Sequence, residues 1–119
     1  MQAYLIIEFN GQTETYKLSE KFTTIGRYQS SSICLPCETI SRRHAYIHFN
    51  DEGIHIIFDG CPHTGRLSKN GIWVNNSKVD PDQGEILNSG DTILLSREAS
   101  IRYVTMTIGG FIDEDGTAA

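Results

Sequence analysis

The chain has 119 residues, of which 39% are hydrophobic and 21% are charged, and ten Lys and Arg against fifteen Asp and Glu give a net charge of −5. This length suits one domain with a hydrophobic core of its own, and the composition excludes a disordered or collagen-like chain. The negative charge argues against a general nucleic-acid binder, because a phosphate backbone demands a positive field.

Two further observations concern the compartment. No run of the sequence approaches the roughly 18 apolar residues that span a bilayer, and the opening residues lack the basic flank and apolar stretch of a secretory signal. The three cysteines, an odd number, do not predict a disulfide framework and fit a reducing compartment. We therefore expect no membrane insertion and a cytoplasmic location, or a nuclear one if the protein is eukaryotic.

Short strands separated by turn residues are predicted along the chain. The first two, 4–9 and 13–18, flank Asn10-Gly11, a strong signal for a β-hairpin. A second hairpin is predicted over 45–58, with its turn at 50–53. No window of 11 or more residues has the spacing of an amphipathic helix, so the sequence predicts an all-β sandwich or barrel. The other predicted strands are 23–25, 33–35, 72–74, 92–95 and 101–107.

The end of the chain differs in composition from the rest. Residues 109–119 are glycine, acidic and small side chains for the most part, and they include three of the fifteen acidic residues. Such a composition is typical of a frayed tail or a linker. We therefore predict one β-domain over 1–108, followed by a flexible acidic tail or linker over 109–119.

Cations and small hydrogen-bonding side chains occur in three predicted loops, 26–32, 38–44 and 59–71. Functional residues of a β-sandwich gather in such loops, because loops vary without unpacking the core. If these three share one end of the sandwich, they form an anion site. Arg then offers a planar donor fork, Ser a hydroxyl, Lys a point charge, and Asn a donor and an acceptor for a peptide backbone. Taken singly, each of these residues is more often a solvated surface residue.

The ordered motifs Gly-Arg, Ser-x-x-His and Asn-Gly resemble those of the forkhead-associated (FHA) domain, a phosphothreonine-peptide binding module. They lie in the stretches 24–27, 40–45 and 68–75, and 87–93 resembles a later turn and strand of the family. Three motifs in the right order are more specific than one alone. The resemblance covers roughly residues 4 to 107. It implies an FHA-like all-β sandwich of eleven strands in two antiparallel or mixed sheets, with the ligand loops at one end.

The resemblance also implies roles for individual residues of the phosphopeptide site. Arg27 is expected to be the principal phosphate anchor, with Ser41 and Arg42 on the same group. Asn70 is expected to hold the peptide main chain just after the phosphothreonine. Lys69 stands where the family usually has a small hydroxyl or glycine. It is included in the predicted binding set, where it either adds charge or crowds the site.

Other loop residues are expected to support the site without touching the ligand. The resemblance gives this role to Gly26, His44 and Gly71. Ile72 replaces the Thr that commonly follows Asn-Gly, and it is expected to adjust the packing under the loop. The outer part of the groove is expected near Asn75, Asn76 and the segment 63–66, where Arg66 either reaches the ligand or faces water.

The cysteines allow an alternative interpretation as a metal site. Cys34 and Cys37 form a Cys-x-x-Cys pair, and Cys61 with His63 would complete a Cys₃His zinc set. The second pair has an unusual spacing, and a redox Cys-x-x-Cys normally opens a helix, whereas this one leaves a predicted strand. Small buried or loop thiols remain the favoured interpretation, so no metal and no cofactor is predicted.

The sequence as a whole predicts a binding module and not an enzyme. No nucleophile or paired carboxylate accompanies His44 in the sequence. The expected partner is a phosphothreonine-containing protein segment produced by an upstream Ser/Thr kinase, and not a nucleic acid. Two alternatives stay open: an interaction or oligomerisation domain of the same fold that works without phosphate, and a zinc-stabilised domain with another ligand.

Overall fold

Eleven β-strands are present in the computed structural model, which describes residues 2–106. The predicted tail 109–119 lies outside the described residues. The strands are β1 (Gln2–Phe9), β2 (Gln12–Leu18), β3 (Phe22–Gly26), β4 (Ile33–Cys34), β5 (Ala45–Phe49), β6 (His55–Asp59), β7 (Trp73–Val74), β8 (Ser77–Lys78), β9 (Glu85–Ile86), β10 (Thr92–Ser96) and β11 (Ala99–Met106).

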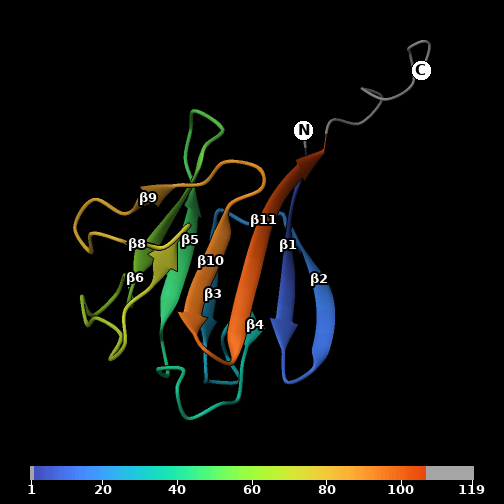
Figure 1. Cartoon of the computed structure of the whole chain (residues 1–119). Coiled ribbons are helices and arrows are strands. Elements are labelled where there is room, and N and C mark those ends of the chain that lie inside the picture. The colour runs from blue at the N-terminus through green and yellow to red at the C-terminus, as the bar shows by residue number, and fades with distance from the viewer. Residues whose placement is uncertain (1, 107–119) are drawn as a thin grey trace.

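The strands form two sheets that pack face to face (Figure 1). One sheet has six strands in the order β2-β1-β11-β10-β7-β8, and the other has five in the order β4-β3-β5-β6-β9. All pairs are antiparallel except β3 with β4, which is parallel. The predicted all-β sandwich of two antiparallel or mixed sheets is therefore confirmed.

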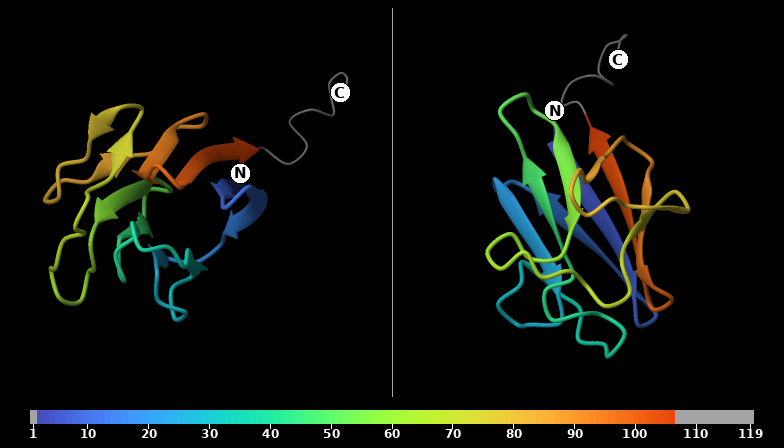
Figure 2. Two further views of the ribbon diagram at one scale, coloured as in Figure 1. Left: turned by 60° about the horizontal axis from the view of Figure 1, so that its bottom comes forward. Right: turned by 90° about the vertical axis from the view of Figure 1, so that its left-hand side faces the viewer.

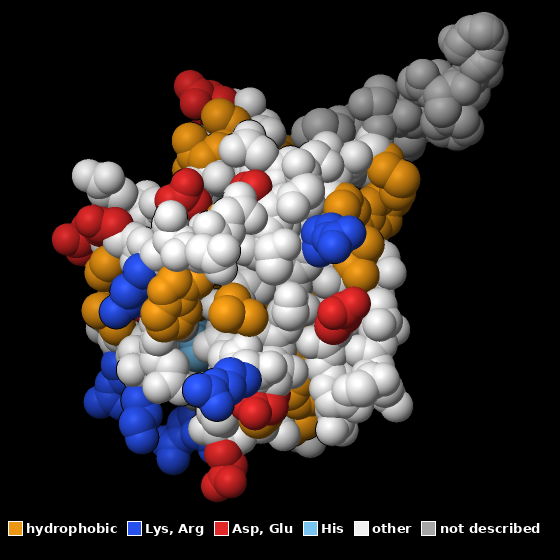
Figure 3. Space-filling view, viewed as in Figure 1, with side chains coloured by type: hydrophobic (Ala, Val, Ile, Leu, Met, Phe, Trp, Pro, Cys, Tyr) orange, Lys and Arg blue, Asp and Glu red, His pale blue; other side chains and the backbone are white. Residues whose placement is uncertain are grey.

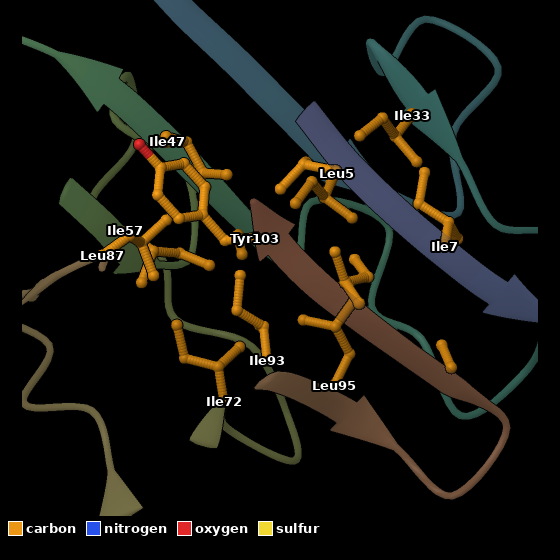
Figure 4. Close-up of a cluster of buried hydrophobic side chains, with 14 of the residues drawn as sticks. Leu5, Ile7, Ile33, Ile47, Ile57, Ile72, Leu87, Ile93, Leu95 and Tyr103 are labelled. Atoms are coloured by element: carbon orange, nitrogen blue, oxygen red, sulfur yellow. The ribbon is translucent and has the colours of Figure 1, made fainter. Parts of the chain in front are cut away.

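The hydrophobic core lies between the sheets because the strands alternate inward apolar side chains with outward ones. In β1, for example, Ala3, Leu5 and Ile7 are buried and their neighbours are more exposed. Figure 4 shows Leu5 and Ile93 from one sheet meeting Ile47 from the other, and all three are almost fully buried. Burying one such side chain stabilises the fold by roughly 1.5–3 kcal/mol, so the core provides a rigid base for the loops.

The two predicted hairpins are confirmed, while two short strands were not predicted. Asn10 and Gly11 both adopt positive φ, 55° and 74°, as a two-residue turn between β1 and β2 requires. The strands β8 and β9 have two exposed residues each. They have too few residues to show an alternating pattern, and they form only because β7 and β6 offer free edges for pairing.

The three cation-bearing loops converge at one end of the sandwich. Figure 2 shows them from two further directions, at the end that is lowest in Figure 1. They are the segments that follow β3, β4 and β6, so each one leaves a strand of the five-stranded sheet. Within residues 2–106 the structure contains no helix that is long and apolar enough to cross a membrane.

Candidate phosphopeptide-binding site

The first loop is fixed directly onto the second by backbone contacts. The Arg27 N–H donates to the Ser41 carbonyl (3.1 Å), and the Tyr28 N–H donates to the Arg42 carbonyl (3.3 Å). Gly26 makes this approach possible, because a Cβ at this position would lie 2.2 Å from the Arg42 carbonyl oxygen. Gly26 thus allows the two loops to approach closely because it has no side chain. The close contact in turn fixes the position of the next residue, Arg27.

His44 joins the second and third loops from beneath. Its Nδ1 accepts the Ser41 N–H at 3.0 Å, and its Nε2 lies 2.8 Å from the Gly71 carbonyl. A donor facing Nδ1 and an acceptor facing Nε2 assign the ring proton to Nε2. His44 is fully buried, and this burial lowers its pKa more than the Gly71 hydrogen bond and the Asp59 charge raise it. A neutral imidazole thus braces the loops and leaves no free nitrogen for the ligand.

The third loop has a second set of braces. The Ser68 N–H donates to the Asp59 carboxylate at 2.8 Å, and the Ser68 hydroxyl accepts the Gly71 N–H at 2.8 Å. Gly71 has a φ of 82°, a conformation that side chains other than glycine rarely adopt. These bonds hold the backbone of 68–71 against β6, so the residues between them have defined positions.

Two residues that are predicted to bind the ligand each form a hydrogen bond to another loop and keep one polar group free. The Ser41 hydroxyl accepts the Lys69 N–H at 2.9 Å, which leaves its own hydrogen free to donate. The Asn70 side-chain amide donates to the Thr39 carbonyl at 3.0 Å, which leaves its oxygen free to accept. Both side chains are thereby oriented before any ligand arrives, which reduces the entropy cost of binding.

The two predicted phosphate-binding arginines are exposed but partly anchored. The Arg27 Nε donates to the Ile40 carbonyl at 3.0 Å, so the two terminal nitrogens of its guanidinium remain for an anion. The Arg42 guanidinium carbon lies 5.8 Å from the centre of the Tyr28 ring, and that of Arg43 lies 5.2 Å from it. Both guanidinium groups are therefore within cation-π distance of the same tyrosine ring.

A groove of about 590 Å³ opens between these loops. In Figure 3 the Lys and Arg side chains gather at the lower left, over the end where Figure 1 shows the loops. Four of the five predicted binding residues line the groove, and Asn70 lies just outside it beside Lys69. The lining residues are Arg27, Tyr28, Ser41, Arg42, Arg43, Cys61, Thr64, Arg66, Leu67 and Lys69.

The structure also resolves several open points about the groove. Arg66 lines it, so this residue faces the same space as Arg27. Lys69 holds its place through its backbone, and its exposed side chain adds charge to the groove. Ile72 is fully buried, which agrees with a packing role. Asn75 and Asn76, which were expected near its outer part, are absent from the lining, and the Asn75 side chain bonds Asp91 and Thr92.

Sequence reasoning missed several lining residues, among them Tyr28 and Arg43. Tyr28 carries no charge and belongs to none of the recognised motifs, so no signal in the sequence marks it. Arg43 stands inside the Ser-x-x-His motif, and its position next to Arg42 was the one available signal. Their contribution to the groove follows from the folding of the loops over one another, which spacing alone does not reveal.

The zinc alternative receives no support from the described residues. Within residues 2–106 no group of three or more His, Cys, Asp and Glu side chains is placed to hold a metal ion. Cys34 is exposed and donates to the Arg27 carbonyl at 3.6 Å, whereas Cys61 is buried in the floor of the groove. Cys34, Cys37, Cys61 and His63 are therefore not brought together as one ligand set.

Comparison with known proteins identifies the family. The FHA domain model matches residues 23–96, which is more than half of the chain and includes the three loops. A two-sheet β-sandwich with a cation-lined groove at its loop end defines the same class of protein. The chain belongs to the FHA domain family, whose members are binding modules and not catalysts.

Individual relatives agree with this assignment. An uncharacterised protein of Synechocystis is 37% identical over 105 residues, which are 83% of this chain and 14% of that protein. The oxoglutarate dehydrogenase inhibitor of Corynebacterium diphtheriae is 33% identical over 82 residues, which are 69% of this chain and 50% of that protein. The chain thus spans half or less of the length of these relatives.

A solved structure is similar over nearly the whole domain. It comes from a structural and functional analysis of phosphothreonine-dependent FHA domain interactions, and it is 29% identical with a TM-score of 0.73. The match covers 90% of this chain and 99% of that one. The fold and the loop end are therefore shared with an FHA domain that was studied for phosphothreonine-dependent interactions.

Proposed function

We propose that this chain binds a phosphothreonine-containing segment of a partner protein in the groove between its three loops. The observation that carries the proposal is the fastening of Arg27, Ser41 and Lys69 to one another by hydrogen bonds at the rim of a cation-lined groove. The site is therefore formed before the ligand binds. The family to which the chain belongs recognises phosphorylated motifs with basic clusters, and this supports the proposal further.

The charges of the site match a phosphate ester. A phosphothreonine carries about −1.5 to −2 charges near pH 7 and three acceptor oxygens. In the proposed complex the free guanidinium nitrogens of Arg27 and Arg42 and the hydroxyl of Ser41 donate to these oxygens. Each charge-assisted hydrogen bond contributes on the order of 1.5–3 kcal/mol, and an unmodified threonine offers none of them. Discrimination for phosphate thus comes from this part of the groove.

Asn70 gives the bound segment its direction. Its free side-chain oxygen is positioned to accept a main-chain N–H of the peptide, because its amide nitrogen is held by Thr39. By the family resemblance this contact lies just after the phosphothreonine. A main-chain contact is independent of side-chain identity. Asn70 therefore contributes affinity and fixes the direction of the bound chain, but it gives no sequence preference. The partner segment would be supplied by a Ser/Thr kinase, because that class of enzyme makes phosphothreonine.

The test is calorimetry with a degenerate phosphothreonine peptide library and its unphosphorylated counterpart. We expect binding of the phosphorylated peptides only, and at least a tenfold loss of affinity in Arg27→Ala, because one anchoring arginine is worth more than about 1.4 kcal/mol here. Arg102→Ala is the matched control, since Arg102 lies exposed on β11 and is not part of the groove. It should bind as the unsubstituted protein does.

Two results would contradict the proposal. Equal affinity of the unsubstituted protein and Arg27→Ala would remove Arg27 from the site. Equal affinity for phosphorylated and unphosphorylated peptides would instead favour an interaction domain of the same fold that does not need phosphate.

A further inference from the structure

We propose that the same groove contains a second anion subsite, formed by Arg43 and Arg66, for a negatively charged side chain that precedes the phosphothreonine in the ligand. The group is either a second phosphorylated residue or the carboxylate of Asp or Glu. The inference rests on the proposed function and specifies which peptide sequences the groove prefers.

The first observation is a surplus of positive charge. Five of the ten Lys and Arg residues of the chain line this groove, although the chain as a whole has a net charge of −5. The described part of the chain contributes neither Asp nor Glu to the lining. One phosphothreonine neutralises about two of the five positive charges. About three positive charges of the groove are then not balanced by the phosphate.

The second observation is that Arg66 stands on a built turn. The Cys61 N–H donates to the Arg66 carbonyl at 3.1 Å, the Gly65 N–H donates to the Cys61 carbonyl at 3.0 Å, and the Arg66 N–H donates to the Thr64 hydroxyl at 3.2 Å. A Cβ at Gly60 would lie 2.3 Å from the Arg66 carbonyl oxygen. The turn is thus closed around a glycine, and its arginine has a fixed backbone position from which to reach the ligand.

The third observation concerns Arg43. It lines the groove and also an adjoining hollow of about 300 Å³ that includes Ser30, Ser31 and His63. Its guanidinium lies over the same Tyr28 ring as that of Arg42. Arg43 therefore extends the positive charge of the groove to the side where the first and third loops approach each other. A ligand longer than one residue would meet it.

The lining of the groove at Cys61, beside Arg43, favours negative charge. Burial raises the pKa of the Cys61 thiol, but the N–H groups of His63 and Thr64, the Thr64 hydroxyl and the positive charge of Arg43 lower it by more. The net pKa lies below the ordinary value. The local dipoles and the arginine thus act in the same direction, and they stabilise an anion at this place.

The direction of the peptide assigns the second subsite to residues before the phosphothreonine. Asn70 is bonded to Thr39 and lies outside the groove lining, next to Lys69. Arg43 also lines the adjoining hollow with Cys61, which includes neither Lys69 nor Asn70, and the Arg66 carbonyl accepts a hydrogen bond from the Cys61 N–H. If Asn70 holds the main chain after the phosphothreonine, the preceding residues extend away from Asn70 and toward the two arginines.

The experiment compares four phosphothreonine peptides of otherwise equal sequence in calorimetry. One has neutral flanks, one has Glu at the four preceding positions, one has a single phosphoserine among those positions, and one has the same Glu residues after the phosphothreonine. We expect the two peptides with preceding anions to bind about tenfold tighter than the neutral one, because exposed but convergent arginines each add a modest charge-assisted contact. The peptide with following Glu residues should show little gain.

The matching variant is Arg43→Gln/Arg66→Gln, and the quantity compared is the affinity ratio between peptides with preceding and following anions. This ratio should fall to about one in the variant and stay high in Arg97→Gln/Arg102→Gln, which removes two positive charges outside the groove. Thermal unfolding of both variants checks that the fold is kept, and Arg43→Lys/Arg66→Lys, which retains both charges, should restore most of the ratio.

Different results separate the two proposals. Equal gains from preceding and following anions would mean that the extra arginines act only by long-range attraction, and this would overturn the subsite. A ratio that survives in Arg43→Gln/Arg66→Gln would also overturn it, while Arg27-dependent phosphopeptide binding stayed intact. Absence of Arg27-dependent binding to any of the four peptides would overturn the proposed function, and the subsite with it.

Discussion

The turn between β5 and β6 and the loops of the groove are stabilised in opposite ways. In the turn, the Asn50 side-chain oxygen accepts the N–H groups of Glu52 (2.9 Å) and Ile54 (3.0 Å), and the Asn50 carbonyl accepts that of Gly53 (3.1 Å). Every bond stays within four residues of Asn50. This turn projects at the end of the sandwich away from the groove (Figure 1).

The groove loops have local bonds too, but they are also bonded to one another across long stretches of sequence. Ser41 receives bonds from Arg27 and from Lys69, 28 residues further on, and the Thr39 carbonyl receives one from Asn70, 31 residues away. These bonds hold the loops in position relative to one another. The β5–β6 turn is therefore encoded by its own residues, whereas the groove is a product of the tertiary structure. Substitutions at the two ends should consequently differ in what they disturb.

The largest difference is expected between two glycines. In Gly26→Ala the new Cβ would lie 2.2 Å from the Arg42 carbonyl oxygen, so the first two loops must separate. We expect a loss of unfolding free energy on the order of 3 kcal/mol or more, together with loss of phosphopeptide binding. Gly53→Ala is the matched control: it has open space and a φ of 80°, so it should cost about 1 kcal/mol of backbone strain.

Urea denaturation and calorimetry on the two glycine variants make the comparison. Full phosphopeptide binding by a folded Gly26→Ala protein would show that the contact between the loops does not position Arg27. A loss of binding in Gly53→Ala would show that the two ends of the sandwich are coupled.

A second comparison uses two buried histidines. His44→Ala removes the brace between the loops and leaves the Ser41 N–H and the Gly71 carbonyl without their partner, which we expect to cost about 2–3 kcal/mol. His55→Ala removes a buried ring whose Nδ1 lies 2.8 Å from the Tyr103 hydroxyl, with a similar loss. Both variants should be less stable, but only His44→Ala should also lose phosphopeptide affinity.

The affinity of each histidine variant is measured below its unfolding temperature, so that stability and binding are separated. Equal affinity losses in the two variants would mean that His44 acts on the groove only through general stability.

The same contrast explains how far the sequence alone could lead. Asn10-Gly11 and the alternation of β1 are local patterns, and they predicted the hairpin and its buried face. Motif order predicted the family and the convergence of the loops. The cation-π contacts of Tyr28 and the position of Arg66 depend on how the loops pack against one another. The spacing of residues in the sequence therefore does not predict them.

The least well predicted segments share one physical property. Asn75 and Asn76 follow the Asn-Gly motif closely and were expected near the outer part of the groove. Their positive φ values of 51° and 73° make them the turn between β7 and β8, and they do not line the groove. The strands β8 and β9 are defined by backbone pairing with neighbours and not by their side chains. Sequence patterns report burial, and these segments have little of it.

Stability should depend on pH through the two buried histidines. Burial lowers the pKa of His44 and of His55 below the value of 6.5 expected in the unfolded chain. Below that pH the unfolded state binds protons that the folded state does not, so the unfolding free energy falls as the pH drops from 6.5. One such group contributes a slope of at most about 1.4 kcal/mol per pH unit.

Denaturation midpoints at pH 7.5, 6.5 and 5.5 measure this effect. Binding is not used here, because the phosphate itself gains a proton near pH 6. We expect the midpoint to change little between the two higher values and to fall at pH 5.5, with a smaller fall in His55→Ala. A midpoint that rises on acidification would contradict neutral, buried imidazoles at both positions.

The smallest effect is expected for Asn50→Ala, which removes only the local bonds of the β5–β6 turn. Losing a side-chain oxygen that accepts two backbone N–H groups in an exposed turn should cost about 1 kcal/mol, because water replaces it there. Phosphopeptide affinity should be unchanged, since no bond of this turn reaches the groove loops. Reduced affinity in Asn50→Ala would mean that strain passes along β5 from Phe49 to Ala45 and moves His44. In that case the two ends of the sandwich could no longer be treated as independent.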